Sequence, residues 1–311
     1  MRHPVPTLNI VVIASVITAI VLSLLIPQFM DGIAPWLLFF AVFVIGIPHG
    51  AVDHVVAADL YGIKRGTAGH LAFYSSYLLV MLLVGALWLF YPYAGMILFL
   101  LISVYHFGQA DAVALLKSDS RLSALFSWSR GLMIIAAIIF TDPAVCLPII
   151  EAATGMSPGW FSVLYDHSNL ILIAAIGQYF AVAGIVLISR SAGVTSLRFL
   201  GDSLLLATLL VLTHPLIGFA LYFALWHSMG HVQEMIAFFR ENGRRVTIWK
   251  FYQLALPFTA VSIAGLSALF FIQQTYSIGN EMISLLFILI SVLTLPHMLV
   301  VDRMFASKKA Q

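Results

Sequence analysis

Ten long apolar segments follow one another along this chain, and they limit its fold more than any other feature. A transmembrane helix needs about 20 mostly apolar residues. The segments are 8–27, 33–60, 71–91, 94–116, 122–141, 169–189, 199–213, 215–239, 251–272 and 281–303. Only 9% of the 311 residues are charged, whereas a soluble domain has about 25%. The sequence therefore predicts an all-α polytopic integral membrane protein, with about ten transmembrane helices in one domain, 1–311.

The positive charges predict the orientation of these helices. If the N-terminus is cytoplasmic, ten spans assign every Lys and Arg to the cytoplasmic side, including Lys117, Arg121 and Arg130 as loop residues. This is the distribution that the positive-inside rule describes. We therefore expect a multi-pass protein of the cell (inner) membrane with both termini in the cytoplasm. The net charge of +2 is too small to indicate nucleic-acid binding, and the single Cys146 excludes an internal disulfide and a cysteine-built zinc site.

Six histidines lie inside the apolar segments: His49, His54, His106, His227, His231 and His297. An ionisable side chain in a bilayer is costly and marks a candidate functional site. The segments that carry them are all even-numbered, so they run in the same direction. At 1.5 Å per residue, five of these histidines lie roughly 9–20 Å from the cytoplasmic ends. Imidazoles at one depth favour a metal site, because imidazole suits iron, zinc and copper. Taken singly, a buried membrane histidine more often joins two helices by hydrogen bonds than it binds a metal.

Helical phase divides these histidines into candidate ligands and neighbours. His227 and His231 are four residues apart and share a helix face. His49 shares a face with Asp53, whereas His54 points roughly 140° away from His49. One metal ion is therefore not expected to bind both His49 and His54. Residues that could orient a ligand from outside its coordination shell are Asp53, His54, Asp111, Glu234, His297 and Asp302.

Other residues fit this site or have ordinary explanations. Pro48 and Pro296 each precede a histidine, and proline kinks a helix. Gly46 and Gly50 form a pair of small residues that allows close helix contact. His214, before Pro215, is explained by capping or solvation. The aromatic side chains of 219–226 suit either a hydrophobic tunnel or ordinary packing.

Four motifs in series resemble one known family. They are Pro-His-Gly-Ala-x-Asp at 48–53, Tyr-His-Phe-Gly-x-Ala-Asp at 105–111, His-x-x-x-His at 227–231 and Pro-His-Met at 296–298. Their order and spacing resemble the Brp/Blh family of membrane β-carotene 15,15'-dioxygenases over essentially the whole chain.

The resemblance implies a non-haem Fe(II) held by His49, His106, His227 and His231, with His297 as nearby support or a fifth candidate. It also implies that O₂ cleaves β-carotene in the lipid bilayer into two molecules of all-trans-retinal. A microbial rhodopsin is a candidate recipient of the retinal.

Two other classes of function stay open at this stage. A di-iron membrane desaturase or hydroxylase would use similar histidine pairs, but those enzymes also need an adjacent His-His pair, which this chain lacks. A metal or proton transporter would also use intramembrane His and Asp residues. Iron stoichiometry distinguishes the first alternative, and metal uptake by vesicles distinguishes the second.

Overall fold

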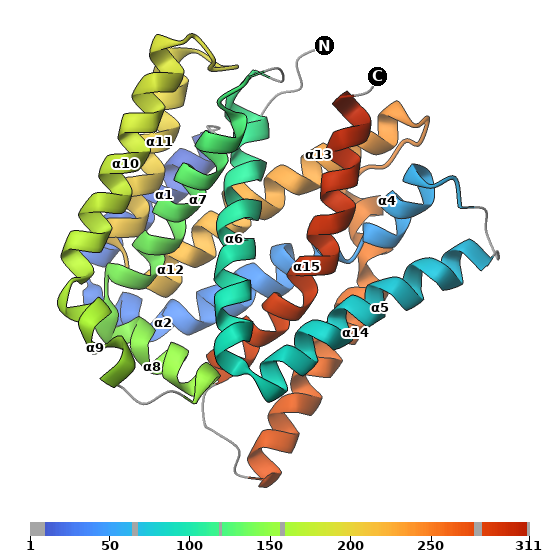
Figure 1. Ribbon diagram of the computed structural model, residues 1–311, viewed down its shortest axis with the longest axis horizontal. Helices are drawn as coiled ribbons and strands as arrows, with labels where there is room; N and C mark the ends of the chain where they lie inside the picture. The colour runs from blue at the N-terminus through green and yellow to red at the C-terminus, as the bar shows by residue number, and fades with distance from the viewer. Residues whose placement is uncertain (1–9, 64–67, 118–119, 156–158, 277–281, 310–311) are drawn as a thin grey trace. The chain divides into compact units, whose positions relative to one another are not determined.

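The computed structural model describes residues 10–63, 68–117, 120–155, 159–276 and 282–309, and nearly all of them are helical. The helices are α1 (Ile10–Leu25), α2 (Pro27–Phe40), η2 (Ala41–Gly46), α3 (Ile47–Gly50), α4 (Asp53–Leu60), α5 (Ala68–Phe90), α6 (Pro92–Leu115), α7 (Ser123–Phe140), α8 (Pro143–Thr154), α9 (Gly159–Asp166), α10 (Ser168–Ile188), α11 (Ser196–Leu212), α12 (Pro215–Leu221), η3 (Tyr222–Ser228), α13 (Met229–Glu241), α14 (Ile248–Tyr276) and α15 (Met282–Lys309). In this described part of the chain, β-type pairing is limited to an isolated bridge between Leu116 and Ala192. The predicted all-α class is confirmed (Figure 1).

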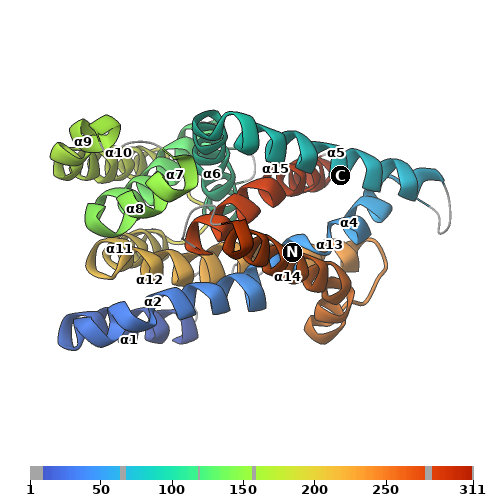
Figure 2. The same cartoon turned by 90° about the horizontal axis from the view of Figure 1, so that it is seen from below.

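The chain forms two compact units. Unit 1 comprises Met1–Val42, Ser103–Glu151 and Met156–Gly230, and unit 2 comprises Phe43–Ile102, Ala152–Gly155 and His231–Gln311. Within unit 1, α7 packs most extensively against α10 and also contacts α11 and α12 (Figure 2). Within unit 2, α15 packs against α5, α4 and α14. The helical stretch 215–241 runs from unit 1 into unit 2, and α6 likewise has residues in both units.

Within the residues that the structure describes, seven helical stretches are long and apolar enough to cross a membrane. They are Pro27–Leu60, Ala68–Phe90, Pro92–Leu115, Ser123–Phe140, Ser168–Ile188, Ile248–Ala268 and Met282–Ser307. Large apolar side chains are exposed on α5, among them Leu78, Leu82 and Leu83. Such extensive exposed apolar surface suits lipid rather than water. The structure thus supports an all-α, multi-pass membrane protein.

The remaining three predicted spans are shorter or less regular than expected. Helix α1 has 16 residues and α11 has 17, and both are below the usual spanning length. The predicted span 215–239 is divided into α12, η3 and α13. The count of about ten spans and the cytoplasmic location of both termini therefore stay predictions.

Two predicted connections are helical in the structure. The gap expected between 27 and 33 belongs to α2, which begins at Pro27. Proline is favourable at the first helical position because its missing N–H would have no intrahelical partner there. The long connection 142–168 contains the helices α8 and α9.

The assignment of Arg130 to a cytoplasmic loop is wrong. Arg130 is the eighth residue of α7, and its side chain is 0% exposed. A cation so placed in a membrane helix requires buried anionic partners.

Two π-helical segments interrupt the helices at histidine motifs. The segment η2 ends at Gly46, just before Pro48 and His49, and η3 includes His227. The nitrogen of Pro48 has no hydrogen to donate to the carbonyl four residues earlier, and the proline ring clashes with that carbonyl. Both effects favour wider helical winding just before Pro48. Short π-helical insertions occur frequently at functional sites.

Candidate metal centre

In unit 1, two of the predicted ligands lie against each other. His106 on α6 and His227 on η3 meet edge to face, with ring centroids 4.8 Å apart. Each side chain is 1% exposed. Each of these imidazoles offers a ring nitrogen within 4.8 Å of one on the other. Two nitrogens this close, inside an apolar interior, suit a shared metal ion.

Aromatic side chains surround this histidine pair. The ring of Phe223 stacks on His227 at 5.4 Å, and the ring of Phe107 meets His227 edge to face at 4.8 Å. Phe107 also contacts Tyr222, and Phe219 stacks on Phe223. The sequence left two explanations for the aromatic side chains of 219–226, a hydrophobic tunnel or ordinary packing. In the structure these rings are buried and pack on one another. They exclude water from the imidazoles.

The backbones of α6 and α7 touch on both sides of His106. A Cβ atom on Gly108 would collide with the carbonyl oxygen of Ser127, and one on Gly131 would collide with that of Val104. No side chain fits at either position. Such direct contact between small residues sets the distance between two membrane helices, and here it holds the helix segment that carries His106.

In unit 2, three imidazoles form a second group. The ring centroid of His49 lies 4.7 Å from that of His297 and 5.7 Å from that of His231. The centroids of His231 and His297 are 5.8 Å apart. All three side chains are buried, at 2–5% exposure. Of the candidate ligands, His49 and His231 therefore meet within unit 2, and His297 joins them.

Hydrogen bonds orient two of these three imidazoles. Nδ1 of His49 donates to the backbone carbonyl of Gly46. Nδ1 of His297 donates to the Asp53 carboxylate, at 2.9 Å to Oδ1 and 3.0 Å to Oδ2, and the Tyr77 hydroxyl donates to the same carboxylate at 2.8 Å. An imidazole that donates through Nδ1 carries its lone pair on Nε2. Carbonyl and carboxylate acceptors orient metal-binding histidines in this way.

The other predicted supporting residues have varied surroundings. His54 is half-buried, donates through Nδ1 to the Ala51 carbonyl, and lies with its ring 4.8 Å from that of Phe258. Asp111 accepts a hydrogen bond from Arg130. Glu234 and Asp302 are half-buried on α13 and α15. His214 caps α12 by accepting a hydrogen bond from the Leu216 N–H at 3.3 Å. Capping was one of the two explanations that the sequence suggested for this residue.

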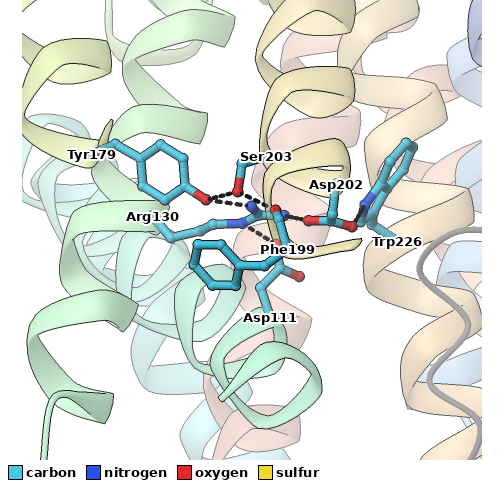
Figure 3. Close-up of polar contacts among 7 residues, drawn as sticks. All are labelled: Asp111, Arg130, Tyr179, Phe199, Asp202, Ser203 and Trp226. Atoms are coloured by element: carbon cyan, nitrogen blue, oxygen red, sulfur yellow. Dashed lines mark hydrogen bonds and ion pairs between the residues drawn. The ribbon is translucent and has the colours of Figure 1, made fainter. Parts of the chain in front are cut away.

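A buried charge network in unit 1, which the sequence analysis did not recognise, has Arg130 at its centre (Figure 3). Its guanidinium donates through Nε to Asp111, through Nη1 to the Tyr179 hydroxyl and through Nη2 to Asp202, each at 2.7 Å. The other Asp202 oxygen accepts from the Trp226 indole N–H at 2.9 Å. One cation thus connects α6, α7, α10 and α11, and through Asp202 also η3. The sequence signal for it was a lone arginine in the middle of the apolar segment 122–141.

The residues present fit a metal ion that prefers nitrogen ligands. Five buried imidazoles occur on helices, and two of them have their Nδ1 atoms committed to oxygen acceptors. Neutral imidazole is a ligand for iron, zinc and copper. His227 and His231 are one helical turn apart on the continuous helical stretch 215–241, so this stretch carries one member of each histidine group.

Comparisons with known proteins identify the family of this chain. The family model for beta-carotene 15,15'-dioxygenase matches residues 40–305. The chain is 25% identical over 274 residues to a beta-carotene 15,15'-dioxygenase of uncultured marine bacterium 66A03, covering 87% of this chain and 94% of the relative. It is 26% identical over 291 residues to a probable beta-carotene 15,15'-dioxygenase Blh of Halobacterium salinarum, covering 84% and 81%. No solved structure matches the chain. Since the matched region spans most of the sequence and includes all five buried histidines, this protein belongs to the Brp/Blh family of β-carotene 15,15'-dioxygenases.

Proposed function

We propose that this protein cleaves the central double bond of β-carotene with O₂ at a non-haem Fe(II) and releases two molecules of all-trans-retinal. The proposed iron ligands are His49, His106, His227 and His231. The observation that carries the proposal is that these four histidines of the family pattern are all buried and form two pairs of facing imidazoles. His106 lies against His227, and His49 lies against His231. Family membership supplies the substrate class.

The sequence spacing of His227 and His231 supports a single iron for the proposed ligands. The two residues are four apart in the sequence, the spacing at which α-helical side chains share a face. The same spacing serves paired metal ligands in other helices.

The protein's own residues would hold the iron, orient the imidazoles and shield the site from water. Bound iron would supply the activation of O₂, which amino-acid side chains do not provide. The Gly46 carbonyl fixes the tautomer of His49, and Asp53 fixes that of His297 beside it. Phe107 and Phe223 cover His227 and keep water away from it. Their apolar surfaces suit a hydrocarbon substrate, and the site's task is to place one double bond correctly.

We place the protein in the cell membrane with both termini in the cytoplasm. The seven apolar helices support a membrane location, and the one-sided distribution of Lys and Arg in the loops supports the orientation. Reporter fusions after Ser191 and Gln311 should read as cytoplasmic. A fusion after Thr154 should read as external, and a cytoplasmic signal there would contradict the proposed orientation.

The test of function is expression in cells that accumulate β-carotene. We expect the cells to lose their orange colour in the presence of O₂ and to accumulate retinal, or retinol formed from it. His106→Ala should abolish bleaching while the protein remains in the membrane, because it removes a proposed ligand. His54→Ala is the matched control and should still bleach, since His54 packs against Phe258. Persistent colour with folded, iron-loaded protein would show that the reaction is a different one.

One observation favours a second candidate, an oxygen-activating enzyme with two iron ions. The fifth imidazole, His297, adds a nitrogen beside His49 and His231, and Asp53 orients it. A two-iron desaturase or hydroxylase would use such an additional ligand. Iron analysis of the purified protein separates the two, because the proposed dioxygenase holds one iron per chain and the alternative holds two.

A further inference from the structure

The Arg130 network lies next to both histidines of unit 1. Asp111 follows His106 by five residues on α6, and Trp226 immediately precedes His227 on η3. Arg130 binds Asp111 through Nε and Asp202 through Nη2, and Asp202 binds Trp226. A continuous chain of side-chain contacts therefore leads from the segment that carries His106 to the segment that carries His227.

The two oxygens of Asp202 have separate tasks. Oδ2 accepts from the guanidinium of Arg130, and Oδ1 accepts from the indole of Trp226. The planar, rigid guanidinium sets the direction of the carboxylate, and hydrogen bonds to a charged acceptor are about twice as strong as neutral ones. Tyr179 and Ser203 complete the surroundings, with a 2.6 Å hydrogen bond between their hydroxyls. With Arg130 and Asp202 both 0% exposed, the carboxylate is held from several sides.

Because η3 is π-helical, the hydrogen bond from the Trp226 indole to Asp202 can help to fix the rotation of this segment. A π-helical insertion departs from the regular hydrogen-bond ladder of the α-helix, so the ladder alone specifies the rotation of this segment less well. Trp226 and His227 are successive residues of this segment, so one rotation of the backbone sets the direction of both side chains. Holding the Trp226 indole therefore holds the direction of the His227 imidazole.

We propose that Arg130, Asp202 and Trp226 are positioning residues for His227, with the indole-to-carboxylate hydrogen bond fixing the rotation of η3. This inference rests on the proposed function, because it takes His227 to be an iron ligand. The three residues act through the helix and do not themselves touch iron or substrate. Loss of the Trp226 indole donor alone should alter the geometry and affinity of metal binding more than it alters folding.

The experiment replaces Trp226 with Phe, which keeps an aromatic ring and removes the N–H donor. The matched control is Trp88→Phe in unit 2, where the buried indole donates to Ser291 Oγ at 2.9 Å. Both variants lose one buried indole hydrogen bond, but only Trp226 adjoins a proposed ligand. Metal-free proteins are titrated anaerobically with Fe²⁺, and then with Co²⁺, whose visible absorption reports coordination geometry. Thermal unfolding of each protein is recorded alongside.

We expect Trp226→Phe to weaken Fe²⁺ binding about tenfold, at the lower end of the effect of outer-shell partners, and to change the Co²⁺ spectrum. Trp88→Phe should keep the parent's spectrum and affinity. Equal metal affinities and equal spectra in the two variants would overturn the positioning role. If Trp226→Phe does not fold, Asp202→Asn replaces it. Asn has an oxygen at only one of the two positions that the guanidinium and the indole use, so the other donor then faces an NH₂ group. The spectrum should again change, and an unchanged spectrum would overturn the inference.

The His227→Ala variant distinguishes a failure of this inference from a failure of the proposed function. If the parent protein binds Fe²⁺ and His227→Ala does not, the ligand assignment stands, and the Trp226 comparison alone decides the positioning role. If His227→Ala binds Fe²⁺ as tightly as the parent, the proposed iron site is wrong and the positioning role falls with it.

Discussion

The two histidine groups are supported by different means. In unit 1, His106 and His227 belong to segments joined by a buried guanidinium, two carboxylates and an indole. In unit 2, a single carboxylate, Asp53, orients His297 directly and receives one further hydrogen bond from Tyr77. The network in unit 1 holds several helices together, whereas the Asp53 carboxylate in unit 2 orients the single imidazole of His297. The difference predicts that mutations in the first network damage folding and geometry, whereas mutation of Asp53 acts mainly on metal affinity.

The largest expected effect is that of Arg130→Leu. It leaves Asp111 and Asp202 buried without their cation, and breaking a buried ion pair by removing one partner costs about 3–5 kcal/mol. The control is Arg244→Leu, which removes a partly exposed pair with Asp59 at 3.0 Å and should cost at most about 1 kcal/mol. The free energy of unfolding in detergent measures both. Similar losses for the two variants would contradict the central structural role of Arg130.

The next effect is that of Gly108→Ala on α6. The new methyl group would collide with the Ser127 carbonyl oxygen, and overpacking of this kind typically costs about 1–3 kcal/mol. We also expect weaker Fe²⁺ binding, because α6 must shift near His106. Gly184→Ala on α10 is the control, since a Cβ there would meet nothing within 4 Å. A Gly108→Ala variant with parental stability and iron content would show that the close helix contact is not needed.

The smallest expected effect on folding is that of Asp53→Asn, which keeps the shape of the side chain and removes its charge. A carboxylate that orients a ligating imidazole typically contributes about 10–100-fold to metal affinity. Because Asp53 orients His297, which lies beside the proposed ligands His49 and His231, the effect should lie at the lower end of that range or below it. The expected result is a higher Fe²⁺ dissociation constant with little change in thermal unfolding. Asp59→Asn on the same helix α4 should keep the parental dissociation constant. An unchanged dissociation constant for Asp53→Asn would limit the Asp53–His297 pair to helix packing.

Part of the fold and site could be predicted from local patterns. The phase argument separated His54 from His49, and the structure places the His54 ring against Phe258. It also identified Asp53 as an orienting carboxylate, although the imidazole that it orients is that of His297, 244 residues away in the chain. Sequence spacing within one helix could not identify that partner, because the contact depends on how α4 and α15 pack.

The sequence by itself determined the all-α membrane class and the family, and it singled out six histidines, of which the structure buries five. Apolar length, helical periodicity and short motifs are local properties that the order of residues carries directly. Only the tertiary structure decided that Arg130 is a buried centre rather than a loop cation, and which histidines face each other. The burial of a charge depends on the partners that other helices bring to it, and Asp111, Tyr179 and Asp202 come from three other helices, 19, 49 and 72 residues away from Arg130 in the sequence.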